Sequence, residues 1–440
     1  MNLRRTFFAF SIPFFALTLS GCSLPFIKRG GGDVTLKYWG LFEPAQIVQP
    51  LIAQYQKDHP NVKIVYEQQT VQEYRERLQT RITQGTGPDV FRFHNTWAPM
   101  IKSVLNPAPS DLFNKENLGK TFFPQAERDL VVDNNVVGVP LMYDGLGLYW
   151  NVDLLRAGGF SQAPKNWDEL RTMAAALTVK EQSGKIKTAG IALGTASNVD
   201  HFSDILAIML LQNGVDLKNP LPGDPQQDQL AVDAIDFYTL FARSSPQERT
   251  WDETMEKSTA AFAAGRAAMY LGPSWRAFEI KQANPSLNFR ISPIPQLPGA
   301  KVTWASYWAE GVSAKSAYQK EAWQFIKFLS EKQSLSTLYT EASKVRLFGE
   351  PYPRAELVSS LQNDPLTGAY VSEAQTAQSF HLASNTFDNG LNDRSINFLK
   401  DAVNAVLKGQ NSKTALSTFA KGITQVREQF QFGVTKASGQ

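Results

Sequence analysis

Residues 85–97 read GTGPDVFRFHNTW, and this stretch decides the fold. Two glycines and a proline near its start break any helix and turn the chain. A short apolar strand begins at 89–91 and ends in three polar or aromatic residues, His94, Asn95 and Trp97. A strand that emerges into such residues places them at the carboxyl edge of a sheet, where open α/β sheets bind ligands. The alternative is an ordinary loop, strand and loop with a tryptophan on the surface.

The residues before this stretch alternate between strand and helix patterns. Alternating apolar residues predict strands at 34–38 and 62–66, and apolar residues at helical spacing predict helices at 47–55 and 71–82. Together with the strand at 89–91 the order is βαβαβ. This order is typical of a parallel sheet with helices on its faces.

The rest of the chain mixes short strands with amphipathic helices. Asn166 and Glu169 predict a capping box at a helix start. Trp167 and Trp323 fall on apolar helical stripes and are predicted to be core residues. The prolines at 293, 295 and 298 indicate a crossover or a domain boundary. The patterns predict strands at 136–140, 191–193, 268–271 and 289–291, and helices at 167–177, 202–209, 230–241, 255–264, 322–329, 396–407 and 415–430.

Length and charge narrow the class of protein. A chain of 440 residues is longer than one hydrophobic core usually covers, so two domains are expected. Hydrophobic residues make up 43% and charged residues 19%, as in a folded globular protein. The net charge of +3 is too small to indicate nucleic-acid binding, and no basic run supports it.

The N-terminus predicts export and a lipid anchor. Arg4 and Arg5 precede an apolar run at 7–19, which is shorter than the roughly 20 residues of a transmembrane helix. The run ends in Leu-Ser-Gly-Cys, which resembles the lipobox of bacterial lipoproteins. That resemblance implies a signal peptide at 1–21, a diacylglycerol on Cys22, a linker at 22–33 and attachment to the outer face of the cell membrane, on the periplasmic or cell-surface side. A plain signal peptide with an incidental cysteine is the alternative. Because Cys22 is the chain's one cysteine, the exported body holds no disulfide.

Six further motifs follow the lipobox in a characteristic order. They are TGPDV at 86–90, LYWNVDLLRAGG at 148–159, PKNWDEL at 164–170, FAAGRAAMYLGPSW at 262–275, EAWQFIKFL at 321–329 and NAVLKGQNSKTAL at 404–416. Taken together they resemble the extracellular solute-binding proteins of ABC importers, of the maltose-binding type.

The resemblance implies an α/β fold of two lobes. Each lobe is expected to be a mostly parallel sheet flanked by helices, and crossing hinge strands join the two. Lobe one would comprise 34–143 and 301–349, and lobe two would comprise 144–300 and 350–440. The implied function is to bind a carbohydrate, a mono- or oligosaccharide, in the cleft and to deliver it to an ABC permease. The implied receptor is a monomer without cofactor or enzymatic activity.

Several site positions follow from the same resemblance. Trp39 and Glu43 match the loop after the first strand, Phe93 matches an aromatic position, and Trp275 matches an aromatic platform. Asp144 matches an acidic group that faces the ligand, and Arg346 lies in a loop near the hinge. One departure is that Thr96 and Trp97 replace the acid and arginine of maltodextrin binders, so a maltose-like contact set is not expected.

The chemistry of a sugar agrees with these residue types. A sugar has an apolar ring face and a rim of hydroxyls, which suit flat aromatic rings and fixed hydrogen-bonding groups. A lone histidine such as His94 is more often structural than a ligand contact. The predicted ligand-binding set is Trp39, Glu43, Phe93, His94, Asn95, Trp97, Tyr143, Asp144, Trp275, Tyr307, Trp308, Glu310 and Arg346.

Three other functions stay open at this point. The solute can be a peptide, a polyamine or a glycerol phosphate instead of a sugar. Carboxylates such as Glu43 and Asp144 also suit a carbohydrate-active enzyme, in which two carboxyl groups flank the scissile bond. A purely structural surface lipoprotein is the third. Four dispersed histidines and the absence of an HExxH motif argue against a metal site.

Overall fold

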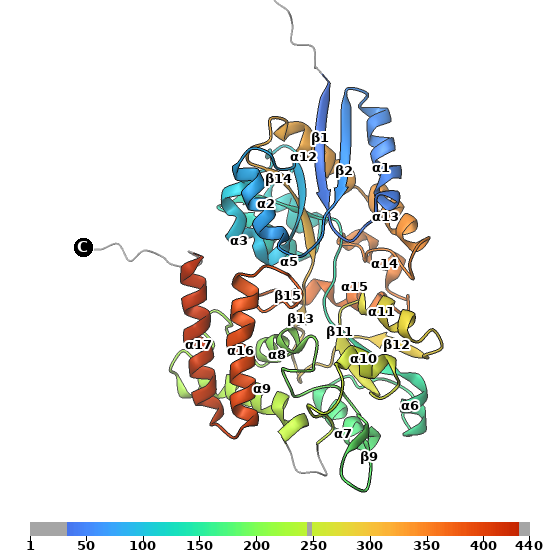
Figure 1. The fold of residues 1–440 in the computed structure, drawn as a ribbon, viewed down its shortest axis with the longest axis vertical. Coiled ribbons are helices and arrows are strands. Elements are labelled where there is room, and N and C mark those ends of the chain that lie inside the picture. The colour runs from blue at the N-terminus through green and yellow to red at the C-terminus, as the bar shows by residue number, and fades with distance from the viewer. Residues whose placement is uncertain (1–32, 244–248, 431–440) are drawn as a thin grey trace, which may run out of the picture.

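A computed structural model describes residues 33–243 and 249–430 (Figure 1). The predicted signal peptide and Cys22 lie outside the described residues. Within those residues, no helix combines the length and the apolar character that a membrane span requires. The elements gather in two groups, one at each end of the long axis in Figure 1, and several segments of the chain cross from one group to the other.

The sheet of the first group is built around the opening motif. Strands β1 (Val34–Gly40), β2 (Val62–Gln68) and β3 (Val90–His94) are parallel, as predicted, with β1 between the other two. Strand β14 (Trp308–Ser313) returns from far along the chain and lies antiparallel to β3. It also pairs with β4 (Leu105–Asn106) and β7 (Val139–Pro140). The sheet order is therefore β2-β1-β3-β14-β4.

Amphipathic helices cover this sheet. Helix α1 (Ala45–Asp58) contacts α13 (Lys332–Ser343) and β2, and α12 (Gln319–Leu329) contacts β14. Trp323 of α12 is fully buried, as predicted for a core residue, and its indole Nε1 donates to Asn106 Oδ1 at 2.9 Å. The other elements of this group are α2 (Tyr74–Thr83), η1 (Asn95–Trp97), α3 (Ala98–Ile101), η2 (Lys102–Val104), α4 (Lys115–Thr121), α5 (Pro124–Leu130), β5 (Val131–Val132) and β6 (Asn135–Val136).

The sheet of the second group differs from the expected parallel arrangement. Strand β8 (Gly147–Asn151) lies in the centre, and β11 (Met269–Gly272) and β12 (Phe289–Ser292) both run antiparallel to it. Helix α11 (Arg276–Ala283) connects β11 to β12 and lets these two strands run in the same direction on either side of β8. The two-lobed α/β class holds, but the parallel sheet is a correct description of the first lobe only.

The predicted strand at 191–193 is wrong. Residues 191–193 are fully buried but are not part of a strand. Just before them, Ala189 forms one isolated bridge with Ala267. A short, continuous apolar run has no period that separates a strand from a buried extended segment, which explains the error.

Helices surround the second sheet. The predicted helix at 255–264 is shortened to α10 (Ser258–Ala263). Helices α16 (Leu391–Leu407) and α17 (Ser412–Gln429) pack against each other and against α9 (Pro225–Arg243). The remaining elements are α6 (Val152–Ala157), α7 (Trp167–Leu177), β9 (Val179–Lys180), β10 (Ile186–Thr188), α8 (Phe202–Gln212), η3 (Ala355–Leu357), α14 (Val358–Leu361), α15 (Gly368–Glu373) and η4 (Ala374–Thr376).

Three separate stretches of chain meet between the two groups. Gly145 forms a bridge with Ala305, and the Tyr143 N–H donates to the carbonyl of Pro351 at 2.9 Å. A side chain at Gly145 would collide with the backbone oxygen of Trp304, so this close approach requires glycine. Nearby, β13 (Thr303–Trp304) pairs with β15 (Ala377–Gln378). The exact lobe boundaries stay a prediction.

The capping box at the start of α7 is confirmed. Asn166 Oδ1 accepts from the Glu169 N–H at 2.8 Å, and Glu169 Oε2 accepts from the Lys165 N–H at 2.8 Å. Trp167 follows the cap and is 3% exposed, as predicted for the core.

We expect Asn166→Ala to lower the free energy of unfolding by about 1 kcal/mol, because the first turn of α7 loses its side-chain acceptor. Urea unfolding followed by circular dichroism measures the change. Gln162→Ala, in the preceding loop, is the control. A loss no larger than that of the control would contradict the role of the cap.

Candidate functional site

A cavity of about 370 Å³ lies where the crossing segments meet, and both groups of elements line it. This volume is within the range of small-molecule sites in proteins. Its walls combine aromatic rings with acidic and hydroxyl side chains. The lining residues are Phe42, His94, Met142, Asp144, Gly145, Leu146, His201, Asp204, Pro273, Trp275, Phe278, Glu279, Ser306, Tyr307, Trp308, Arg346, Glu350, Ser384, Asn385 and Phe387.

The cavity brings together part of the predicted set. The predicted residues that line it are His94, Asp144, Trp275, Tyr307, Trp308 and Arg346. Their contact with a ligand stays a prediction. The predicted residues that do not line it are Trp39, Glu43, Phe93, Asn95, Trp97, Tyr143 and Glu310, and all seven are buried.

Glu43 and Glu310 are parts of a buried ion-pair network and do not line the cavity. The Arg92 guanidinium pairs with both, contacting Glu310 Oε1 at 2.7 Å and Glu43 Oε2. Tyr38 also donates to Glu310 Oε1 at 2.9 Å. Burial raises the pKa of Glu43 to about 8, although Arg92 opposes that shift. Arg92 and Glu310 form an ion pair inside the sheet, and Glu43 also interacts with Glu350, which lines the cavity.

Four of the predicted aromatic residues pack in the core. Trp39 is 8% exposed, and its indole Nε1 donates to Glu67 Oε2 at 2.8 Å. Trp97 is fully buried, with its ring centroid 5.3 Å from that of Trp308. Phe93 is also fully buried, and Tyr143 is 2% exposed with its hydroxyl 3.3 Å from the Trp304 carbonyl oxygen. Of these residues, Trp97 packs against Trp308, which lines the cavity.

Asn95 does not line the cavity but hydrogen-bonds to Tyr307, which does. Its side-chain Oδ1 accepts from the Tyr307 N–H at 3.1 Å, and its Nδ2 donates to Asp129 Oδ2 at 2.8 Å. The Tyr307 hydroxyl donates to the same carboxylate oxygen at 2.9 Å. Burial raises the pKa of Asp129, and the hydrogen bonds from Ser379, Asn95 and Tyr307 oppose it. This cluster holds Tyr307 in place.

Asp144 is the carboxyl group at the crossing point. Its Oδ1 accepts from the Gly145 N–H at 2.8 Å and the Ser274 N–H at 3.0 Å, and its Oδ2 accepts from the Ser274 hydroxyl at 2.8 Å. Burial raises the pKa of Asp144 to about 7, and these hydrogen bonds oppose the rise. The group therefore changes charge near neutral pH.

This shift predicts a pH dependence of stability. The folded pKa lies above the ordinary value of 3.8, so the folded protein binds the proton more tightly than the unfolded chain. The stabilising contribution is full below about pH 4 and is lost as the pH rises through about 7. Relative to Asp144→Asn, we expect the parent chain to lose on the order of 4 kcal/mol of unfolding free energy between pH 4 and pH 8. Urea titrations across this range measure the difference, and parallel curves for the two proteins would contradict it.

Two tryptophans provide flat walls. Trp275 directly precedes α11, and the Arg276 guanidinium lies 4.2 Å from its ring centroid. Trp308 begins β14 and makes edge contacts with Phe42 and His94, at centroid distances of 5.2 and 5.1 Å. Each ring is thus fixed by its neighbours and can act as a rigid surface.

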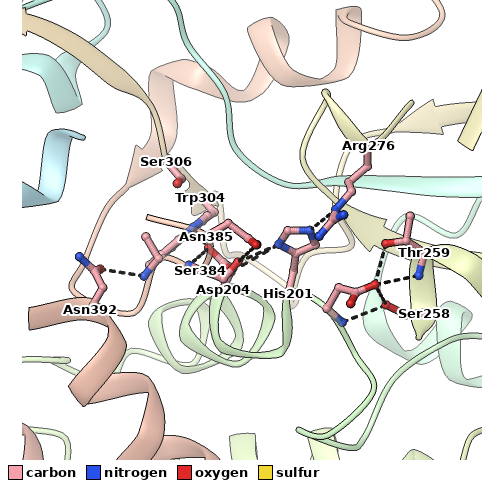
Figure 2. A network of polar contacts seen from close by, with 12 residues as sticks. His201, Asp204, Ser258, Thr259, Arg276, Trp304, Ser306, Ser384, Asn385 and Asn392 are labelled. Carbon is pink, nitrogen blue, oxygen red and sulfur yellow. Dashed lines mark hydrogen bonds and ion pairs between the residues drawn. The ribbon is translucent and has the colours of Figure 1, made fainter. Parts of the chain in front are cut away.

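Sequence reasoning missed a cluster of polar residues that line the cavity (Figure 2). The cluster consists of His201, Asp204, Ser384 and Asn385. Asp204, in the first turn of α8, accepts from the Trp304 indole Nε1–H at 2.8 Å and from the Ser384 N–H at 3.2 Å. His201 precedes this helix, and Ser384 and Asn385 lie in the loop before α16. The one available signal was the pattern of small polar residues around Ser384, which is common in loops.

Of the residues that the structure describes, no three His, Cys, Asp or Glu form a group that could hold a metal ion.

Residues 50–346 match the family model described as bacterial extracellular solute-binding protein. The chain belongs to this family. The match covers more than half of the chain, and it confirms the resemblance to extracellular solute-binding proteins on which the sequence analysis relied.

Individual relatives agree with the assignment. A maltotriose-binding protein of Pyrococcus abyssi is 23% identical over 360 residues, covering 79% of this chain and 73% of its own. The maltodextrin-binding protein MdxE of Bacillus subtilis is 24% identical over 399 residues, covering 85% and 87%.

Solved structures confirm the fold class. The sugar-binding protein MalE of Xanthomonas citri superposes with a TM-score of 0.73 at 20% identity, covering 90% of this chain and 98% of its own. A cyclo/maltodextrin-binding protein in complex with maltotetraose gives a TM-score of 0.71 at 19% identity, covering 91% and 99%. At this identity the similarity establishes the two-lobed fold.

Proposed function

We propose that this solute-binding protein takes up a carbohydrate, a mono- or oligosaccharide, in the cavity between its lobes. The observation that carries the proposal is that Trp275 and Trp308 line the same cavity as Asp144 and Asp204. Aromatic planes suit the apolar faces of a sugar ring, and carboxylates accept strong hydrogen bonds from its hydroxyls. The sugar-related names of the two relatives above support the same class of ligand.

The proposal extends to delivery and location. An exported receptor of this family, held by a diacylglycerol on Cys22, would present its solute to an ABC permease as a monomer. The lobes would comprise 34–143 with 301–349, and 144–300 with 350–440. A ligand that touches both lobes binds the closed form better and shifts the population toward it, which provides a state for the permease to recognise.

A titration tests the choice of ligand. We would add glucose, maltose, maltotriose, mannobiose and tagatose to the full-length protein in detergent and follow tryptophan fluorescence and the heat of binding. We expect a saturable change for at least one sugar, since two tryptophans line the cavity. A response to spermidine, a dipeptide or glycerol 3-phosphate and to no sugar would overturn the carbohydrate proposal in favour of another solute.

A carbohydrate-active enzyme is the second possibility, because Asp144 and Glu350 both line the cavity. The family and the relatives above are binding proteins, which favours binding without turnover. Product analysis after overnight incubation with the bound oligosaccharide separates the two, since a binding protein returns the sugar unchanged.

A further inference from the structure

Two buried histidines each hold a serine that lines the cavity. His94, at the end of β3, is 1% exposed, and its Nε2 lies 3.0 Å from Ser306 Oγ. His201 is 2% exposed, and its Nδ1 lies 2.8 Å from Ser384 Oγ. A neutral imidazole has one donor nitrogen and one acceptor nitrogen. The group behind each ring therefore decides whether the histidine donates to its serine or accepts from it.

Arg276 decides the tautomer of His201. Its Nε lies 2.9 Å from His201 Nε2, and Figure 2 shows His201 between Arg276 and Ser384. A guanidinium is always a donor, so Nε2 must carry the lone pair. The proton of the ring is then on Nδ1 and points to Ser384 Oγ. Asn385 Nδ2 donates to the same oxygen at 3.1 Å.

Thr96 decides the tautomer of His94 in the opposite sense. The backbone N–H of Thr96 approaches His94 Nδ1 at 3.4 Å, and its hydroxyl oxygen lies 2.9 Å from the same nitrogen. Asn392 Nδ2 donates to that hydroxyl oxygen at 2.7 Å, so the Thr96 proton is free to point at His94. Nδ1 is therefore an acceptor, and Nε2–H donates to Ser306 Oγ. Burial lowers the pKa of His94 to about 3, which agrees with a neutral ring.

We infer that His94 and His201 are positioning residues that leave the hydroxyl protons of Ser306 and Ser384 as donors to the ligand. Each serine oxygen already accepts from its histidine. Across the described ranges no hydrogen bond takes the proton of either hydroxyl to an acceptor in the protein. The inference rests on the proposed function, because it assigns which ligand atoms this cavity selects.

The assignment divides the cavity by chemistry. Ser306 and Ser384 require ligand atoms that accept, such as hydroxyl, ring or glycosidic oxygens. Asp204, and Asp144 in its charged form, require ligand atoms that donate. A sugar oxygen can do both, whereas the protonated nitrogens of a polyamine only donate and would leave both serine protons unpaired. The donor pattern therefore favours polyols over polyamines.

Nitrogen NMR tests the two tautomers without any ligand. The full-length protein, labelled with 15N at its four histidines, reports which ring nitrogen carries the proton through its chemical shift. At pH 7 we expect Nε2–H for His94 and the rarer Nδ1–H for His201. Variants His59→Gln, His94→Gln and His381→Gln, each missing one signal, assign all four. An Nε2–H or doubly protonated His201, or an Nδ1–H His94, would overturn the inference.

Matched variants separate a positioning role from a structural one. Arg276→Met removes the donor and should move His201 toward Nε2–H, while Arg276→Lys retains a donor and should preserve Nδ1–H; neither should change His94. With maltotriose as the probe, Ser384→Ala and Arg276→Met should each lower affinity by about tenfold, the effect of one lost hydrogen bond.

The two proposals fail separately. Correct tautomers in a chain that binds none of the sugars would contradict the proposed function and leave the positioning roles standing. Reversed tautomers would contradict the positioning roles whichever solute binds.

Discussion

Replacing Arg92 by methionine is expected to lower the free energy of unfolding by about 3–5 kcal/mol, the usual cost of removing one partner from a buried ion pair. The Arg92 side chain is 3% exposed and lies between the carboxylates of Glu43 and Glu310, whose side chains are 2% and 0% exposed. Without the guanidinium, the buried carboxyl groups lose their cationic partner, and this loss destabilises the sheet. Urea unfolding at pH 7, followed by circular dichroism, measures the loss.

A surface pair is the matched control. Arg243 and Asp236 lie 2.8 Å apart with side chains 35% and 38% exposed, so Arg243→Met should cost less than about 1 kcal/mol. Adding Glu310→Gln to Arg92→Met should recover part of the loss, because it removes one of the stranded charges. Equal losses for Arg92→Met and Arg243→Met would contradict a central role of the network.

Replacing Trp275 by alanine is expected to weaken sugar binding by about 30–100-fold, or roughly 2–3 kcal/mol, because aromatic anchors dominate binding energy. The ring lines the cavity and is held by the Arg276 guanidinium, so it needs little reorganisation to receive a sugar face. Trp275→Phe keeps a flat ring and should lose less than about fivefold. Isothermal titration with maltotriose, or with whichever sugar the panel identifies, measures each constant.

Trp39→Phe provides the comparison for this prediction. Trp39 is buried beside Glu67 and does not line the cavity, so its replacement should leave the dissociation constant unchanged even if stability falls. An unchanged constant for Trp275→Ala, or a large effect of Trp39→Phe, would show that the site has been assigned to the wrong tryptophan.

Local sequence patterns predicted the elements whose determinants are local. The parallel β1, β2 and β3, the cap at Asn166 and the buried Trp323 all depend on residues within one or two turns or strands. The place of β14 in the sheet could not be predicted, because Trp308 pairs with His94 from 214 positions away and no local period records a partner. The same applies to the antiparallel sheet around β8.

The site was predicted in part for a related reason. The ends of strands identify a region, but they do not say which side chains turn inward. Arg92 offered a clue that was not used, since a charged residue in the buried strand VFRFH needs counter-charges, and these are Glu43 and Glu310. No comparable clue existed for His201 and Ser384, which are 183 residues apart in the chain and meet only in the fold.

A crystal structure of the full-length protein with a bound sugar tests the central claim most directly. The account predicts electron density for the sugar in the cavity between the lobes, against the rings of Trp275 and Trp308, with its hydroxyls toward Asp144 and oxygen acceptors toward Ser306 and Ser384. Density for the sugar elsewhere on the protein, with this cavity holding solvent alone, would contradict the account.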